Sequence, residues 1–213
     1  MKTRCRAAVL AAVASLFVVS LAACASMGSG AAFTLSTTAV SGPPETGFDS
    51  GLVSVGRLDA MYGAKPGGPA NPRSFPFTWK NLPPGTKALA VVLDDPDARP
   101  VLKAFGRTGD FFLHWTAADI DPALGGLPDN AAAAMKITQG KNGAGNVGWQ
   151  APTPPADVPK DTDKVRIHVY RLKVYALKGP TGLQPGFTLD ELMAAIKDTT
   201  LGMAQLNVSY SNQ

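Results

Sequence analysis

Cysteine is almost absent from this chain of 213 residues. The two cysteines that it contains, Cys5 and Cys24, both lie close to the N-terminus. A disulfide within the body of the chain is therefore excluded, whichever compartment the protein occupies. Stability must come from an apolar core instead, and the 190 residues from Cys24 to Gln213 are enough for one domain with a sizeable core.

The chain also lacks a strong excess of charge of one sign. Its formal net charge is +4, and three of its 20 basic residues are Lys2, Arg4 and Arg6. The remainder carries 17 basic against 16 acidic side chains. Because the basic residues are scattered singly and form no stripe, the sequence excludes nucleic acid as a partner.

Long hydrophobic runs are missing too, apart from one near the N-terminus. Ala7 to Leu21 is apolar, follows the three basic residues, and is shorter than a bilayer-spanning helix requires. The tetrad Leu21-Ala22-Ala23-Cys24 then resembles the bacterial lipobox, in which cleavage occurs before a cysteine that becomes lipidated. We therefore predict a lipoprotein signal peptide at residues 1–23 and lipidation of Cys24. An ordinary secretory signal followed by an unrelated cysteine is the alternative.

The residues after the cleavage site predict where the protein is held. Residues 24–32 are small, polar and glycine-bearing, which indicates a flexible tether, and we expect the domain to occupy residues 33–213. Ala25 stands where an aspartate would favour retention in the inner membrane. We therefore expect an exported membrane lipoprotein, held in the outer membrane of a two-membrane cell and facing the periplasm or the cell surface.

Strand patterns dominate the body of the chain, and one helix start is clearly marked. Thr188 and Glu191 form a capping-box pattern before an amphipathic segment, and a helical turn within residues 131–135 is compatible with the sequence. The expected strands cover residues 88–93, 111–116, 165–177 and, as an edge or closing strand, 205–210. Many short strands with one or two short helices predict an all-β, sandwich-like domain.

The two histidines of the chain, His114 and His168, both fall in expected strands. Since side chains alternate between the two faces of a strand, His168 shares a face with Tyr170, and this face becomes wholly apolar from Leu172 onward. A polar pocket at the end of a core has this pattern, with both polar side chains at its rim. The alternative is that His168 and Tyr170 are two surface polar residues on a half-exposed strand, which would give the same pattern.

Two further motifs carry groups suited to a binding site. In Asp95-Pro96-Asp97 the proline holds both carboxylates on a rigid turn, where they would orient histidines; a solvated acidic turn is the commoner role of such a triplet. In Pro152-Thr153-Pro154-Pro155 only Thr153 has a backbone N–H, so a stiff loop would aim one donor at an anion. Trp149 would add an aromatic wall. A purely structural polyproline turn is the alternative.

Together these motifs resemble the phosphatidylethanolamine-binding protein family, also called the Raf-kinase-inhibitor-like family, in its bacterial branch. The motifs that occur in the family's order and approximate spacing are Leu89 to Asp97, His114-Trp115, Gly148 to Pro155 and His168 to Tyr170. The resemblance extends from about Phe33 to Ser211. It implies an antiparallel β-sandwich with one or two short peripheral helices and a small surface pocket that accepts phosphate-like or carboxylate-like anions.

The resemblance also implies which residues form this pocket. Carried over by position, the ligand-binding residues are Asp95, Asp97, His114, Trp149, Thr153, His168 and Tyr170. We expect no catalytic residue, no cofactor and no metal. The stretch between Asp97 and His114 is longer than in many bacterial members.

These expectations favour a lipid-anchored envelope protein whose pocket binds a small anionic ligand, phosphate-like or a phospholipid headgroup, and catalyses nothing. A lipid-tethered inhibitor of a protease or of another protein partner is one alternative, suggested by the Pro- and Gly-rich loops. A metal-dependent hydrolase that uses the two aspartates and the two histidines is another. Against an enzyme, the sequence contains no H-E-x-x-H pair, no G-x-S-x-G elbow and no cysteine in its body.

Overall fold

A computed structural model describes residues 31–64, 72–154 and 167–211 of the chain. The expected signal peptide, Cys24 and most of the tether lie outside these ranges, as do Pro155 and the first two residues of the strand expected from Val165. The described residues all belong to one unit, Ala31–Gln213. No helix within them is long and apolar enough to cross a membrane.

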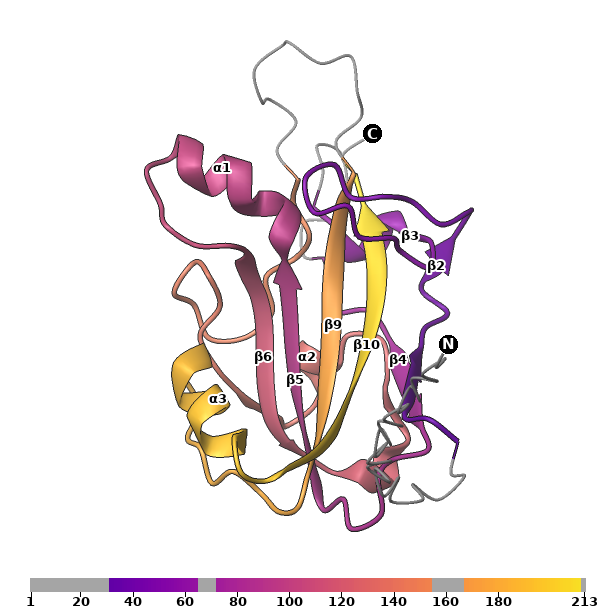
Figure 1. Cartoon of the computed structure of the whole chain (residues 1–213), viewed down its shortest axis with the longest axis vertical. Coiled ribbons are helices and arrows are strands. Elements are labelled where there is room, and N and C mark those ends of the chain that lie inside the picture. The colour runs from indigo at the N-terminus through magenta and orange to yellow at the C-terminus, as the bar shows by residue number, and fades with distance from the viewer. Residues whose placement is uncertain (1–30, 65–71, 155–166, 212–213) are drawn as a thin grey trace, which may run out of the picture. The chain divides into compact units, whose positions relative to one another are not determined.

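Seven strands form the larger of two β-sheets (Figure 1). In order across the sheet they are β2 (Val40–Ser41), β3 (Arg57–Leu58), β10 (Thr200–Tyr210), β9 (His168–Leu177), β5 (Ala88–Asp95), β6 (Phe112–Ile120) and β8 (Thr138–Gln139). Neighbouring strands are antiparallel except β3 and β10, which run parallel. The strands expected from the sequence are all present, and β5 and β6 extend further than the sequence patterns indicated.

The second sheet has three antiparallel strands, β1 (Thr34–Ser36), β4 (Phe77–Lys80) and β7 (Gly126–Leu127), with β4 in the middle. Buried and exposed residues alternate along β4, and its buried Phe77 and Trp79 join the same hydrophobic cluster as Val91 of β5 and Val174 of β9. The main core therefore lies between the two sheets. The predicted all-β sandwich is confirmed, but the parallel pair of β3 and β10 makes the larger sheet mixed and not wholly antiparallel as expected.

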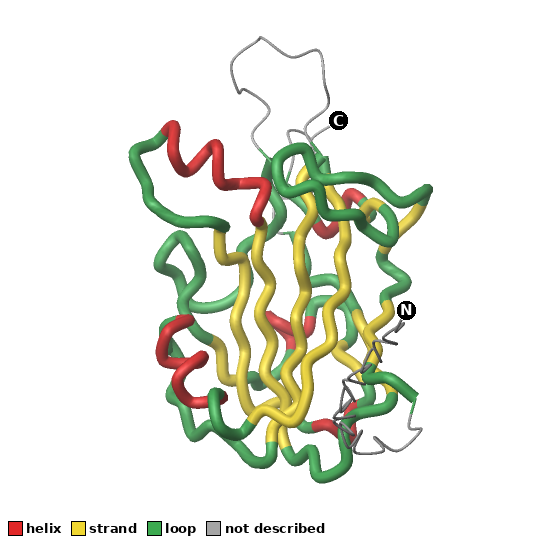
Figure 2. Tube along the Cα trace, viewed as in Figure 1, coloured by secondary structure: helices red, strands yellow, loops and turns green. Residues whose placement is uncertain are grey.

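The outer face of the larger sheet is partly covered by α3 (Leu189–Ile196), seen beside the lower part of β6 in Figure 2. The expected capping box is present: the Thr188 hydroxyl accepts from the Glu191 backbone N–H at 3.2 Å, and the Glu191 carboxylate accepts from the Thr188 N–H at 2.7 Å. Leu192 and Ile196 pack with Ala90 in a second buried cluster. With α3 on one side and the core on the other, β5 is buried along its whole length.

The other helical segments are short. They are α1 (Arg99–Ala104), α2 (Ala131–Ala134) and the 3-10 turns η1 (Ala60–Tyr62), η2 (Pro96–Ala98) and η3 (Pro122–Leu124). The helical turn that the sequence allowed near residue 131 is thus α2, whereas α1 was not predicted. With six residues, α1 is too short to show a helical period of apolar side chains.

The position of β10 corrects one expectation. This strand begins at Thr200 and lies inside the larger sheet, hydrogen-bonded to β9 on one side and to β3 on the other, so it is not an edge strand. Alternation along the sequence indicated a strand, and the structure shows that its buried residues include Ala204, Leu206 and Val208. Alternation could not identify the neighbour β3, which lies far away in the chain.

The antiparallel order brings four strand ends together at one end of the larger sheet. Here β5 ends at Asp95, opposite Phe112 of β6, and β9 begins at His168, opposite Tyr210 of β10. At this same end α1 follows directly after β5 and η2 (Figure 1). Most of the residues that the sequence assigned to a pocket are located here.

Candidate functional site

A carboxylate between two imidazoles forms the centre of the candidate site. Asp95 is the last residue of β5, and its Oδ1 accepts a hydrogen bond from the backbone N–H of Ala98 at 3.1 Å, which caps η2. Its Oδ2 lies 2.7 Å from Nδ1 of His168 and 3.8 Å from Nε2 of His114. All three side chains are buried, with exposed fractions of 3% for Asp95, 4% for His114 and 1% for His168.

The hydrogen bonds of the two histidines fix which ring nitrogen carries a proton. A carbonyl oxygen can only accept, so Nδ1 of His114, 2.8 Å from the carbonyl oxygen of Gln150, must donate. Nδ1 of His168 likewise donates to the carboxylate of Asp95. Both Nε2 atoms are therefore acceptors in the neutral rings and become donors only when the rings are protonated.

The charge of Asp95 follows from the same contacts. Burial raises the pKa of this carboxyl, but the nearby imidazole of His114, the hydrogen bond from His168 and the charges of both rings outweigh burial, and the pKa lies below its usual value. The carboxylate is thus ionised near neutral pH. It can stabilise a positive charge on either imidazole.

A cavity of about 320 Å³ lies next to this group. Its lining combines polar groups from the ends of the strands with residues of α1 and of the stretch that follows α1. Its lining residues are Asp95, Ala98, Val101, Leu102, Phe105, Arg107, Phe112, His114, Gln150, Ala151, Thr153 and His168. Asp95, His114, His168 and Thr153 were assigned to the pocket from the sequence, and the structure brings these four together.

Tyr170 lies behind the two histidines and is not among the residues that line the cavity. It is 0% exposed, with its ring 5.1 Å from that of His114 and 6.4 Å from that of His168. Within the described part of the chain its hydroxyl has no hydrogen-bond partner. Burial, followed by the negative charges of Asp95 and Asp97, raises its pKa well above the usual value, so the hydroxyl stays neutral.

Asp97 does not reach the cavity, although the sequence placed it there. Its Oδ1 accepts from the backbone N–H groups of Asp49 and Ser50 at 2.8 and 2.6 Å, and its Oδ2 accepts from the Ser50 hydroxyl and the Val169 N–H at 2.9 and 2.8 Å. The carboxylate therefore fastens the loop of residues 47–51 to the start of β9. It is neither a pocket residue nor a solvated turn.

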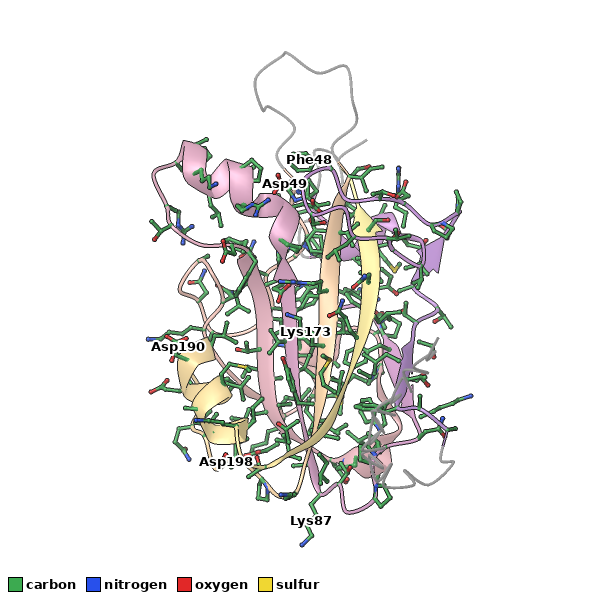
Figure 3. All side chains as sticks on the ribbon, viewed as in Figure 1. Phe48, Asp49, Lys87, Lys173, Asp190 and Asp198 are labelled. Atoms are coloured by element: carbon green, nitrogen blue, oxygen red, sulfur yellow. The ribbon has the colours of Figure 1, made fainter. Side chains whose placement is uncertain are left out.

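The loop that Asp97 holds contacts the site from one side. The ring of Phe48 in this loop packs against that of His168, tilted by 36°, with ring centroids 5.3 Å apart. Figure 3 labels Phe48 and the adjacent Asp49, both at the end of the sheet where α1 lies. Asp49 also pairs with Arg99 of α1 at 2.7 Å, so the loop and α1 are connected directly.

Trp149 and Thr153, which the sequence assigned to the same pocket, line two different cavities. The indole of Trp149 packs edge-on against Phe75 and Trp115, each with centroids 5.9 Å away, and contributes to a separate cavity of about 390 Å³. Thr153 lines the first cavity, and its hydroxyl donates to the carbonyl oxygen of Ala151 at 3.0 Å. Of this pair, only Thr153 is thus a neighbour of the histidines' cavity.

The structure corrects the expected depth of His168 and Tyr170. Both were placed at the rim of the core, but they are almost fully buried, because η2, the 47–51 loop and β10 close over this end of the sheet. Substitutions at these positions therefore also remove buried contacts. Conservative replacements are needed to separate binding from stability.

Sequence reasoning missed Arg107 and the apolar residues of α1. Arg107 lines the cavity, and its Nη2 donates to the carbonyl oxygen of Gly143 at 2.8 Å. The stretch of residues 99–107 carries three basic and no acidic side chains, a composition that could have drawn attention to it. Its short helix, however, could not be placed next to the histidines without the fold.

The hydrolase alternative would require both aspartates and both histidines at one point, and Asp97 is occupied elsewhere by its four hydrogen bonds. Within the ranges that the structure describes, no group of three or more His, Cys, Asp or Glu side chains is arranged to hold a metal ion.

Comparison of the sequence with known proteins gives consistent matches. A family model described as phosphatidylethanolamine-binding protein matches residues 51–211. YxkA of Bacillus subtilis, an uncharacterized protein, is 35% identical over 144 residues, which cover 63% of this chain and 79% of YxkA. LppC of Mycobacterium tuberculosis, whose name marks it as a candidate lipoprotein, is 32% identical over 131 residues, which cover 62% of this chain and 56% of LppC.

Solved structures match as well. The phosphatidylethanolamine-binding protein homologue CT736 of Chlamydia trachomatis covers 84% of this chain and 97% of its own, with a TM-score of 0.63 and 24% identity. YbcL of Escherichia coli, described as a member of the mammalian family, covers 84% of this chain and 98% of its own, with a TM-score of 0.61 and 23% identity. At these identities the likeness shows a shared fold.

Proposed function

Because the chain belongs to the phosphatidylethanolamine-binding protein family, in its bacterial branch, we propose that the cavity beside Asp95 binds a small anionic ligand without transforming it. The ligand is a phosphate-like anion or the headgroup of a phospholipid. The observation that carries this proposal is His168. His168 lines the cavity, and its Nδ1 is hydrogen-bonded to Asp95. Its Nε2 is buried and has no hydrogen-bond partner among the described residues.

The chemistry of the site supports an anion through the protonated histidines. Once protonated, the rings of His114 and His168 each offer an Nε2 donor, and hydrogen bonds between charged groups contribute about 1.5–3 kcal/mol each. Asp95 stabilises these positive charges but would repel an anion if both rings were neutral. Binding should therefore be coupled to proton uptake by the site.

Titration calorimetry tests this coupling. The probe is glycerophosphoethanolamine, whose phosphodiester keeps its charge through neutrality, and the protein is the unlipidated chain of residues 25–213, which contains the whole described unit. Affinity should be higher at about pH 6 than at about pH 8, because a protonated imidazole offers the anion a charged Nε2 donor that a neutral imidazole lacks.

The matched variants are His168→Gln and Tyr170→Phe, both checked for folding by circular dichroism. His168→Gln removes the charged donor and should weaken binding at least about tenfold at the lower pH. Tyr170→Phe removes a hydroxyl from the same buried face without changing the charge, and should cost less. Binding that is unchanged in His168→Gln, or that disappears when divalent ions are chelated, contradicts the proposed site.

We further propose that the protein acts at a membrane of the cell envelope, held there by a lipid on Cys24. The cleavage-site tetrad before Cys24 supports this proposal, as does the 32% identity with LppC. The absence of an aspartate after Cys24 favours the outer membrane. A pocket for phospholipid headgroups would then lie within reach of its ligand.

A further inference from the structure

One wall of the cavity differs from the rest in its chemistry. The side formed by β5, β6 and β9 presents Asp95, His114 and His168. Another part is formed by the segment of residues 98–107, which we call the α1 segment, and five of the twelve lining residues belong to it. They are Ala98, Val101, Leu102, Phe105 and Arg107.

Arg107 gives this wall a permanent positive charge. Its contact with the carbonyl oxygen of Gly143 uses one of the five N–H donors of a guanidinium, which leaves the group able to bind an anion as well. The imidazoles of His114 and His168 donate from Nε2 only when protonated. Among the described lining residues, Arg107 is thus the one side chain that offers charged donors at every physiological pH.

The rest of the wall is apolar and partly open to solvent. Phe105 is 78% exposed, although it lines the cavity, while the neighbouring Leu102 is 8% exposed. An exposed phenyl ring beside a charged site gains from contact with an apolar group on a ligand. A cavity of about 320 Å³ is also at the lower end of the range for organic ligands.

We propose that the α1 segment selects the ligand: Arg107 binds a phosphate group, and Val101, Leu102 and Phe105 contact a short apolar substituent on it. The ligand class is a phosphate ester with an alkyl or aryl group of a few carbon atoms. A terminal phosphate has three acceptor oxygens, which match the three donors of Arg107, His114 and His168. This inference rests on the proposed function, since it concerns the same cavity.

A series of methyl, propyl and hexyl phosphate tests the apolar contact by titration calorimetry with residues 25–213. Each methylene group that becomes buried should raise the affinity by up to about fourfold, until the wall is covered. Phe105→Ala should flatten this rise without affecting folding, because the ring is largely exposed. Leu124→Ala is the matched control, since Leu124 is also exposed, at 49%, and does not line the cavity.

The charge contact is tested with Arg107→Gln and Lys103→Gln. Both remove one positive charge from the α1 segment, but only Arg107 lines the cavity. Arg107→Gln should weaken all three phosphates at least about tenfold and equally, because the phosphate group is common to them. Lys103→Gln should change the affinities less than about twofold, as expected for a screened surface charge.

The results separate this inference from the proposed function. Equal affinity for the three esters, or equal effects of Arg107→Gln and Lys103→Gln, overturns the role of the α1 segment while phosphate binding itself stands. No binding of any ester at millimolar concentration overturns both. Dihexanoyl phosphatidylethanolamine distinguishes the two sources of a phosphate ester. If this lipid binds more tightly than hexyl phosphate, and Phe105→Ala weakens both ligands by the same factor, the result supports a lipid as the source. If the lipid binds more weakly than hexyl phosphate, the result supports a free ester.

Discussion

At the scale of single residues, the carboxyl group of Asp95 links backbone geometry to the state of the site. One oxygen caps η2 through the Ala98 N–H, and the other holds His168 by its Nδ1. The turn that follows β5 and the tautomer of the imidazole are therefore fixed by the same side chain. A change of residue 95 should affect both stability and binding.

We predict that Asp95 makes stability depend on pH in the acid range. Its pKa in the folded protein is lowered by the two histidines in spite of burial. The stability that it contributes is thus fully present above the pKa of an unfolded aspartate, about 3.9, and is lost as the pH falls through the lower folded value. In urea unfolding followed by tryptophan fluorescence, Asp95→Asn should be less stable than the parent chain near neutrality. The difference should shrink towards about pH 3.

Asp198→Asn is the control for this experiment. Asp198 is exposed and lies at the opposite end of the sheet from the site (Figure 3). Its replacement should change the free energy of unfolding by about 0.5 kcal/mol at most, and by a similar amount at every pH. If the difference in stability between Asp95→Asn and the parent chain were the same at every pH, this carboxyl would not be the group stabilised by the histidines.

Whether a residue could be assigned correctly to the cavity from the sequence depended on whether its contacts lie in segments that the sequence patterns identify. The sequence placed Asp95, His114 and His168 in one pocket through the family resemblance, and in the structure all three line the same cavity. Asp97 was misplaced, because the 47–51 loop that it binds lies far earlier in the chain. Nothing in an Asp-Pro-Asp triplet shows which of its carboxylates faces a cavity and which binds a loop.

At the scale of elements, Asp97 connects three segments that the strands alone would leave separate. Its carboxylate joins η2, the 47–51 loop and the start of β9. The loop in turn places Phe48 on the ring of His168. The position of the imidazole therefore depends on contacts made outside the sheet.

We predict that Asp97→Asn destabilises the domain by about 2–4 kcal/mol, because a buried charged acceptor is lost and the new amide N–H₂ faces N–H or O–H donors. Ser50→Ala removes one of the four hydrogen bonds of this carboxylate and the one that the Ser50 hydroxyl accepts from the Leu52 N–H, and should cost about 1–2 kcal/mol. Urea unfolding measures both. Equal effects of the two changes would mean that the carboxylate does not fasten the loop as described.

Elements with strong local signals were predicted and the others were not. The start of α3 was evident from Thr188 and Glu191, since a capping box is formed by residues three apart. For α1, the six residues from Arg99 to Ala104 give too little pattern, and the residue with which Arg99 pairs, Asp49, lies 50 positions earlier in the chain. The sequence alone therefore could not place the α1 segment beside the cavity.

At the scale of the whole molecule, the proposed lipid site at Cys24 lies outside the unit that contains the described core. All of the described core lies within Ala31–Gln213, and the expected lipid site precedes it. We predict that Cys24→Ala moves the protein from the membrane fraction to the soluble fraction of the envelope, or leaves it unprocessed. Cell fractionation with metabolic labelling by a fatty acid measures this.

Cys5→Ala is the matched control, because Cys5 would leave with the signal peptide. This variant should be processed, labelled and membrane-bound like the parent chain. A Cys24→Ala protein that still carries the fatty acid would overturn the lipobox interpretation.

The interior position of β10 has a consequence for synthesis. Because β10 lies between β9 and β3, the ribosome makes an inner strand of the larger sheet after all of the other described strands. Residue 57 can pair with residue 209 only after all of the chain between them has been made, and pairings so distant in sequence form slowly. A nascent or prematurely terminated chain that lacks residues 200–210 would leave β9 with an unpaired edge. Such a chain would be a template for aggregation and a substrate for proteases.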